Sequence, residues 1–251
     1  MGVEDINIRM NVHGEPVEIG VSVPSEPVKL RRMLPLLRQM SNGFVGAAVD
    51  QVRAGGKEIS CRAGCGACCR QLVPVSEVEA FELRELVDSM PEPRRSEIRE
   101  RFASGAARLR DAGYFERLDL AARESEAAYA AMVNEYFEFG VACPFLENES
   151  CSIHADRPIT CREYLVTSPP AYCASAEGTG VQTVRQIFEL KEALISTSRV
   201  RTAEELPYVP MISVLEWTDT GTDDAPTRTG REWMSSLFER MMEIGNRNET
   251  A

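Results

Sequence analysis

The cysteines of this chain limit its possible folds more than any other feature of the sequence. The chain has 251 residues and eight cysteines, which fall into two groups. The first group is Cys61, Cys65, Cys68 and Cys69. The second group is Cys143, Cys151, Cys161 and Cys173. A packed core does not need thiols at this density, so we interpret both groups as ligands of a metal centre and the remaining chain as its scaffold.

The bulk composition is that of a soluble globular protein. Hydrophobic residues make up 43% and charged residues 27%, and no window approaches the roughly 18 consecutive apolar residues of a membrane span. Residues 1–5 lack the basic start and apolar run of a secretory signal. The expected location is therefore cytoplasmic, where clustered cysteines bind metal more often than they form disulfides. A disulfide framework stays open for an oxidising compartment.

The charge of the chain bears on its partners. The formal net charge is −11, from 28 Lys and Arg against 39 Asp and Glu. Such a field repels polyanions, so we expect neither nucleic acid nor an anionic membrane as a partner. The basic pairs at 31–32 and 94–95 are expected on solvated helix faces. The expected partners are a metal ion and, if there is turnover, a protein substrate or partner.

Hydrophobic periodicity predicts a hairpin followed by helices. Residues 6–12 and 17–23 alternate apolar with polar side chains around a Gly/Pro turn at 13–16, which is typical of a β-hairpin. A lone hairpin is marginal in water, so it should pack on helices. Helical spacing recurs over residues 34–52, 76–87, 98–109, 120–139, 184–195 and 229–242. The motifs at Ser76/Glu79 and Thr229/Glu232 are capping boxes that open two of these helices.

The predicted fold is mainly α: a helical domain with an N-terminal β-hairpin and an irregular cysteine-rich metal-binding lobe. The hairpin extension spans 1–30 and the helical cysteine-cluster domain 31–200. A C-terminal helical extension, 201–251, packs on the same domain. The metal lobe combines 58–70 with 141–175, which we expect to be irregular because residues 141–180 are rich in Pro, Ser and Gly.

The first cysteine group has the spacing of a metal loop. A C-x3-C-x2-C segment is short enough to curl three sulfurs around one centre, and Gly64 and Gly66 allow close backbone approach. The side chains of adjacent residues such as Cys68 and Cys69 tend to diverge, so one tetrahedral ion does not readily take both. Two centres, or one polynuclear cluster fed by both groups, are therefore expected.

Basic side chains near the cysteines are candidates for contact with the centre. Four thiolates leave a net charge of roughly −2 on Zn²⁺ or on an oxidised [4Fe–4S] core. The flanking arginines are Arg62, Arg70, Arg157 and Arg162. We select Arg70 and above all Arg162, which directly follows Cys161. His154 is a candidate ligand or a hydrogen-bond donor to a sulfur, and a nucleophilic pair with Cys151 or Cys161 is an alternative.

Several short motifs occur in one order along the chain. They are Cys65-Gly-Ala-Cys68-Cys69-Arg70, Cys143-Pro-Phe-Leu146, Cys151-Ser-Ile-His154, Arg157-Pro158 and Cys161-Arg162. The segment from about 58 to 175 resembles the YkgJ-type cysteine-cluster family, also called the CxxCxxCC family. Two features depart from its pattern: the first spacing is x3 rather than x2, and His154 stands where a tyrosine is common.

The resemblance implies chelation of iron, possibly as an iron–sulfur cluster, or of zinc. Carried over by position, the implied ligands are Cys61, Cys65, Cys68, Cys69, Cys143, Cys151, Cys161 and Cys173. Flagellin lysine-N-methylases carry a similar cluster, which implies an alternative function as an iron–sulfur-dependent protein lysine methylase. Whether the chain is an enzyme is left open at this point.

Two other function classes share part of the pattern. The C-x3-C-x2-C spacing also occurs in radical S-adenosylmethionine enzymes, but an aromatic residue usually precedes their third cysteine, where this chain has Ala67. Thioredoxin-like chemistry at Cys65 and Cys68 would need a βαβ context, which the pattern does not predict. The main contest is between a closed binding site and an enzyme with an open metal position beside a pocket.

Overall fold

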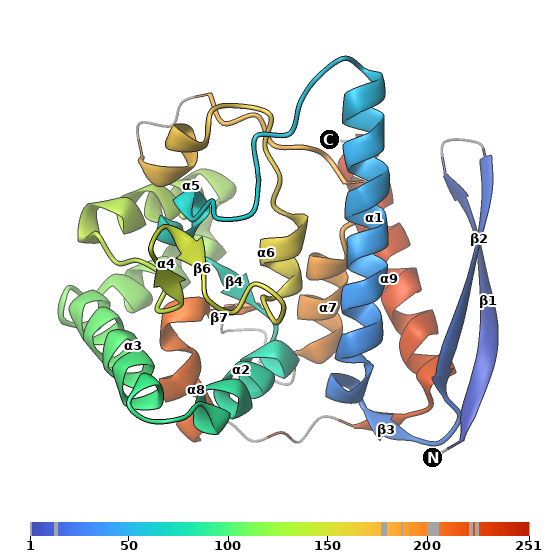
Figure 1. Cartoon of the computed structure of the whole chain (residues 1–251), viewed down its shortest axis with the longest axis horizontal. Helices are drawn as coiled ribbons and strands as arrows, with labels where there is room; N and C mark the ends of the chain where they lie inside the picture. The colour runs from blue at the N-terminus through green and yellow to red at the C-terminus, as the bar shows by residue number, and fades with distance from the viewer. Residues whose placement is uncertain are drawn as a thin grey trace.

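The computed structural model describes residues 2–12, 15–176, 180–186, 188–199, 206–220, 223 and 226–250, with only the backbone described at 10–12, 15–17 and 246–250. Helices dominate this part of the chain (Figure 1). The α-helices are α1 (Leu34–Ala54), α2 (Glu77–Ser89), α3 (Arg94–Asp111), α4 (Tyr114–Glu124), α5 (Glu126–Glu135), α6 (Ile159–Glu163), α7 (Leu190–Ser198), α8 (Val214–Thr220) and α9 (Gly230–Thr250). The 3-10 turns are η1 (Leu30–Met33), η2 (Ala67–Arg70), η3 (Tyr136–Phe139), η4 (Pro170–Ala174) and η5 (Met211–Ser213).

The strands form four separate two-stranded antiparallel pairs. The pairs are β1 (Val3–Val12) with β2 (Glu15–Pro24), β3 (Val28–Lys29) with β8 (Thr227–Arg228), β4 (Pro74–Val75) with β7 (Val209–Pro210), and β5 (Leu146–Glu147) with β6 (Ser150–Cys151). In three of the pairs each strand is two residues long, and the pair joins two segments of the chain. The fourth, β1–β2, is the predicted N-terminal hairpin.

The hairpin lies at one edge of the molecule, beside α1 and α9 (Figure 1). Its register places Ile6 opposite Val21 and Ile8 opposite Ile19. Ile6 and Val23 are buried against the helices, as expected for a two-stranded sheet that cannot be stable alone. The hairpin prediction is confirmed, although the predicted turn residues His13 and Gly14 lie outside the described residues.

Both predicted capping boxes are present. The Glu79 amide donates to Ser76 Oγ at 3.4 Å, and the Ser76 amide donates to Glu79 Oε2 at 3.4 Å, at the start of α2. At the start of α9 the Thr229 amide donates to Glu232 Oε2 at 2.8 Å. Each box satisfies amides that a helix start leaves without intrahelical partners.

The single helix predicted over 120–139 is wrong. The chain forms α4, α5 and η3 instead, and Ser125 separates the first two with an extended backbone (φ −167°, ψ 161°). Its Oγ accepts the Ala128 amide at 3.1 Å, which caps α5. The local preference of serine for an N-cap therefore outweighs the alanine-rich helical pattern around it.

The helix predicted over 184–195 begins later, at Leu190. The preceding residues are extended, because the Thr167 amide donates to the Gln182 carbonyl at 2.9 Å and the Val184 amide to the Leu165 carbonyl at 2.8 Å. The start of α7 is set by Glu163, whose carboxylate accepts the amide of Leu190 at 3.2 Å. A cap from a distant element is not visible in local periodicity.

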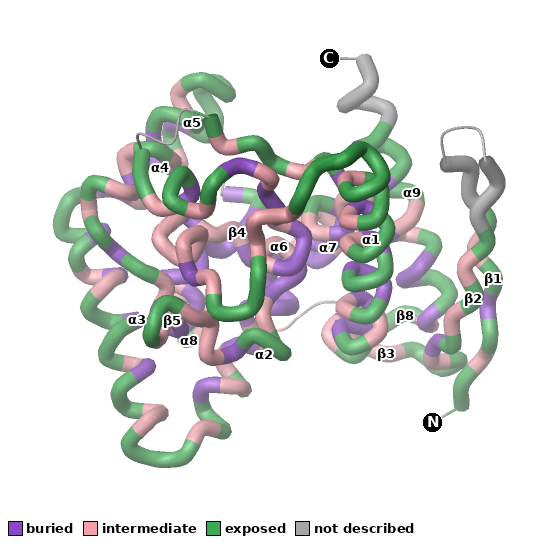
Figure 2. The backbone as a smooth tube through the Cα atoms, turned by 45° about the horizontal axis from the view of Figure 1, so that its top comes forward, coloured by how far each residue is buried: buried purple, intermediate pink, exposed green. Residues whose placement is uncertain are grey.

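Residues 141–176 are more ordered than predicted, since they contain β5–β6, α6 and η4. Three hydrophobic clusters surround them. The first joins the hairpin to α1, α7 and α9, the second joins α2, α3 and α8, and the third joins α4 and α5. Ile159 belongs to the first, Phe145 and Ile153 to the second, and Leu72 to the third. The cysteine segments therefore lie where the three clusters meet, and Figure 2 shows buried residues gathered around α6 and α7 there.

In the described part of the chain, no helix combines the length and apolarity that crossing a membrane requires.

Candidate metal centre

Cysteines from three separate segments of the chain line one cavity. The cavity has a volume of about 240 Å³. The cysteines on its wall are Cys65, Cys68, Cys69, Cys143, Cys151 and Cys161. All eight cysteines of the chain are described, and each carries a free thiol. The two groups, far apart in sequence, therefore meet in space.

The first loop is bonded directly to the start of the second group. The Cys143 amide donates to the Cys69 carbonyl at 2.7 Å. At Gly66 the two segments touch so closely that a Cβ atom would lie 2.7 Å from the Glu149 carbonyl oxygen and against the Leu146 side chain. Only glycine fits there without displacing backbone, so Gly66 allows the two groups to approach.

The β5–β6 hairpin carries Cys151 back toward the loop. Its turn residues Asn148 and Glu149 have φ values of 49° and 59°, the left-handed pair that a two-residue hairpin turn requires. The Ser152 amide and hydroxyl both donate to the Phe145 carbonyl, at 2.9 and 3.0 Å. These bonds close the hairpin and hold Cys151 at the cavity.

Helix α6 presents Cys161, and two buried glutamates fix that helix. Glu79 of α2 accepts the Ile159 amide at 2.7 Å, at the first residue of α6. Glu163, at the last residue of α6, accepts Ser41 Oγ at 3.2 Å and two amides of α7. Both carboxylates are buried, so α6 is held at each end by the helical scaffold.

Two cysteines predicted as ligands, Cys61 and Cys173, are not among the residues that line the cavity. The segment preceding Cys61 is bonded to the chain after α6, with the Ser60 amide donating to the Val166 carbonyl at 2.9 Å. Cys173 is buried, and its carbonyl accepts Gln71 Nε2 at 2.9 Å. Both lie close to the first loop, but outside the common wall.

The donor set on the wall fits a thiophilic metal. Six thiols exceed the four that a tetrahedral zinc or iron site uses. Nevertheless, no three cysteine, histidine, aspartate or glutamate side chains among the described residues stand close enough together to hold an ion as they are placed. The fit to a metal therefore lies in the type and number of the donors that line the cavity.

Residues 60–182 match the family model CxxCxxCC, described as "Putative zinc- or iron-chelating domain". The chain therefore contains a CxxCxxCC domain over these residues. No curated protein and no solved structure matches the chain. The match encloses all eight cysteines, so the resemblance noted from the motifs is confirmed. The CxxCxxCC description names zinc and iron as alternatives and does not choose between them.

Several thiols of the CxxCxxCC domain have raised pKa values, which favours their protonated form. A hydrogen bond to the Cys143 thiol, followed by burial, raises the pKa of Cys69 to about 12. A hydrogen bond with Cys69 likewise raises the pKa of Cys68, and burial raises the pKa values of Cys151 and Cys161. Cys68 and Cys69 are therefore in mutual contact rather than divergent, contrary to the expectation for adjacent residues. A bound cation reverses this preference, because it stabilises thiolates.

Arg162, the preferred arginine of the sequence interpretation, does not line the cavity of the CxxCxxCC domain. It is buried, and its Nε donates to the Arg157 carbonyl at 2.9 Å. Its other nitrogens donate to the Ala155 carbonyl and to Asn42 Oδ1 of α1. Arg162 thus positions the loop before α6 rather than facing the thiols.

Arg70 also points away from the cavity, and it joins the first loop to the β5–β6 turn. Its Nη2 donates to Glu149 Oε1 at 2.6 Å and its Nη1 to the Gly66 carbonyl at 3.3 Å. His154 does line the cavity. The nearby Arg157 charge, with burial, lowers the pKa of His154, so its imidazole is neutral at pH 7 and can act as a ligand.

Other polar residues on the wall were not selected from the sequence, although Arg62 and Arg157 were named there among the flanking arginines. They are Arg62, Gln71, Arg157, Thr160, Tyr164 and Lys191. Five of them lie within four residues of a cysteine, which is the signal that sequence reasoning offered. Lys191 comes from α7, and no sequence feature connects it to the cysteines.

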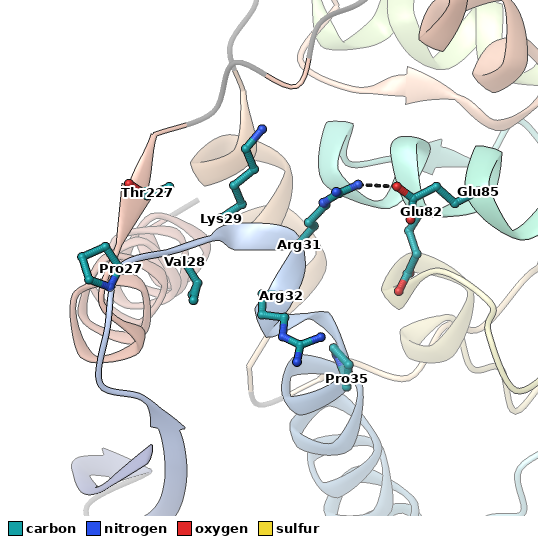
Figure 3. A pocket seen from close by; sticks show the side chains of 9 residues that line it. All are labelled: Pro27, Val28, Lys29, Arg31, Arg32, Pro35, Glu82, Glu85 and Thr227. Atoms are coloured by element: carbon teal, nitrogen blue, oxygen red, sulfur yellow. Dashed lines mark hydrogen bonds and ion pairs between the residues drawn. The ribbon is translucent and has the colours of Figure 1, made fainter. Parts of the chain in front are cut away.

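A second groove, of about 620 Å³, lies between the start of α1 and α2 and contains no cysteine among the residues described (Figure 3). Its basic side chains include Arg31, which pairs with Glu85 across the groove. Asp223 also pairs with Lys29 at 3.1 Å. The charges of this groove are therefore largely balanced within the chain, as expected for a solvated surface.

Proposed function

We propose that the chain chelates iron or zinc in the 240 Å³ cavity through Cys65, Cys68, Cys69, Cys143, Cys151 and Cys161. The observation that carries this proposal is the convergence of these six thiols from three segments on one wall. Each thiol that becomes a ligand releases its proton to solvent, so binding is coupled to pH. His154 is a further candidate ligand, since it lines the same wall.

The number of wall thiols favours a polynuclear centre over one tetrahedral ion. One four-coordinate ion leaves two of the six sulfurs without a metal, and so does one iron–sulfur cluster, which takes four cysteines. Two metal ions that share thiolates would use all six sulfurs. Cys68 and Cys69 are in contact and both face the cavity, which suits a centre with more than one metal atom. An iron–sulfur cluster held by four of these thiols is the alternative form of the centre.

The test is metal analysis of anaerobically purified protein together with its visible absorption. Stoichiometric iron with broad absorption near 400 nm supports the cluster, and stoichiometric zinc in a colourless protein supports the zinc form. Cys68→Ser and Cys143→Ser should each lose most of the metal. Cys173→Ser, at a buried cysteine off the wall, is the matched control and should retain it.

Equal metal loss in all three serine variants would contradict the proposed ligand set, as would wild-type protein that binds neither metal. The iron–sulfur enzyme alternative, a protein lysine methylase, has no specific contact in its favour among the described residues. This enzyme alternative predicts that the bound iron reacts with a methyl donor. The chelation proposal predicts that the metal is bound and that no substrate is turned over.

A further inference from the structure

The charged side chains of the cysteine cavity have one sign. Arg62, Arg157 and Lys191 line it, and its described lining includes no aspartate or glutamate. The whole chain, by contrast, carries a formal charge of −11. A basic wall in an acidic protein attracts a negatively charged occupant.

Of these side chains, Arg157 is the one with a buried nitrogen that lacks a hydrogen-bond partner in the described part of the chain. Its Nε is buried, and no hydrogen-bond acceptor reaches it among the described residues. Leaving a buried donor of a charged group unpaired is unfavourable, so such groups normally face a ligand, an ion or a water. Arg38 Nε is also buried without a partner among the described residues, but the Nη atoms of Arg38 bond Glu82. Arg70 and Arg162 each bond a carboxylate or a carbonyl.

The loop that carries Arg157 is built to hold its side chain in the cavity. Arg162 donates to the carbonyls of Ala155 and Arg157, and Arg38 Nη2 donates to the Asp156 carbonyl at 3.3 Å. Three successive carbonyls are thus bonded by guanidinium groups from α6 and α1. The backbone is fixed by these bonds, while Arg157 Nε has no hydrogen-bond acceptor among the described residues.

We propose that Arg157 is the buried counter-charge of a thiolate–metal centre whose own net charge is negative. This inference rests on the proposed function and makes it more specific. The thiolates of the centre carry more negative charge than the metal neutralises, as when four thiolates bind one divalent ion. Arg157 donates its Nε hydrogen to a ligand sulfur, a contact that stabilises the thiolate over the thiol. Its role is to position and neutralise the ligand set.

The experiment compares zinc affinity in Arg157→Gln, Arg157→Lys and Arg32→Gln, measured by competition with a chromophoric chelator. Arg32 is exposed and lines the remote groove of Figure 3, so its variant removes the same charge away from the cavity. Arg157→Gln should weaken zinc binding by about 10–100-fold. Arg157→Lys, which keeps the charge but not the Nε donor, should lose less, and Arg32→Gln should match the wild type.

A second readout separates this role from a structural one. Because Arg157 Nε has no partner in the metal-free chain, the metal-free Arg157→Gln protein should melt at or above the wild-type temperature. A lower melting temperature of that metal-free variant would overturn the inference, and so would wild-type zinc affinity in Arg157→Gln. Wild-type protein that binds no metal would overturn both the inference and the proposed function.

Titration of the metal-free protein with inorganic phosphate tests the rival explanation, a simple anion site. Phosphate binding that Arg157→Gln abolishes, with zinc affinity unchanged, would overturn the inference in favour of that site. Absence of phosphate binding, combined with the loss of zinc affinity, supports the counter-charge role.

Discussion

Gly66 shows how one residue decides whether the two cysteine groups meet. Its φ of −104° is open to any residue, so backbone conformation does not require glycine. The requirement is steric, because the Glu149 carbonyl occupies the space of a side chain. The glycine between Cys65 and Cys68 is thus needed for contact with a segment about eighty residues away in sequence. It is not needed for its own loop to curl.

We predict that Gly66→Ala destabilises the protein by about 1–3 kcal/mol, the usual cost of overpacking, and lowers its metal content. Denaturant unfolding and metal analysis measure the two effects. Gly43→Ala is the control, since Gly43 is an exposed residue within α1 with open space around its Cα. Alanine in a helix interior should stabilise that variant by about 0.5–1 kcal/mol. A Gly66→Ala protein with wild-type stability and metal content would contradict the packing argument.

The raised thiol pKa values predict how the metal-free protein responds to alkali. A thiol whose pKa is higher in the folded than in the unfolded chain, where it is about 8.5, favours folding below that value. The stabilisation is lost as pH rises through the folded pKa, about 12 for Cys69. Melting temperatures of reduced, metal-free protein should therefore fall between about pH 8 and 9.5.

Cys69→Ser removes one of these thiols and is the matched variant for that measurement. Its melting temperature should fall less steeply over the same pH interval than that of the wild type. Identical slopes would show that the Cys69 thiol does not titrate as its surroundings indicate.

At the scale of elements, α6 is a five-residue helix that owes its position to other helices. Glu79 belongs to the capping box of α2 and also accepts the first amide of α6. One buried carboxylate thus caps its own helix and holds the helix that carries Cys161. Sequence reasoning identified the capping box, but not its second bond.

Glu79→Ala and Ser76→Ala separate these two roles. Ser76→Ala loses only the cap and should cost about 0.5–2 kcal/mol. Glu79→Ala also leaves the Ile159 amide buried without an acceptor, which adds about 1–3 kcal/mol. We expect zinc affinity to fall in Glu79→Ala and to stay near wild type in Ser76→Ala. Equal stability and equal affinity in the two variants would refute a separate role for the α2–α6 bond.

At the scale of the whole molecule, loss of the metal should affect the metal lobe and the hydrophobic clusters to different extents. The cluster of the hairpin, α1, α7 and α9 includes no cysteine among its described members. Cys143 and Cys151, in contrast, pack against the cluster of α2, α3 and α8. Metal binding supplies about 10–16 kcal/mol in zinc-finger peptides, comparable to the stability of a domain.

We therefore predict that chelation loosens the lobe before the helices. Hydrogen exchange after metal removal should accelerate most over 60–71 and 143–163, and least in α1 and α9. The metal-loaded protein under the same conditions is the control. Equal acceleration in both regions would show that the metal stabilises the fold as a whole, and unchanged exchange everywhere would show that it stabilises neither.

Local patterns along the chain were sufficient for the hairpin and for the capped starts of α2 and α9, because period and caps depend on neighbouring residues. Thiol density and motif order also identified the CxxCxxCC domain. Long-range contacts decided the rest. Glu163 sets the start of α7, Gly66 sets the distance between the cysteine groups, and the loop fixed by Arg38 and Arg162 selects Arg157 for the cavity. A linear sequence does not show which side chains face one space, since that depends on packing between segments far apart in the chain.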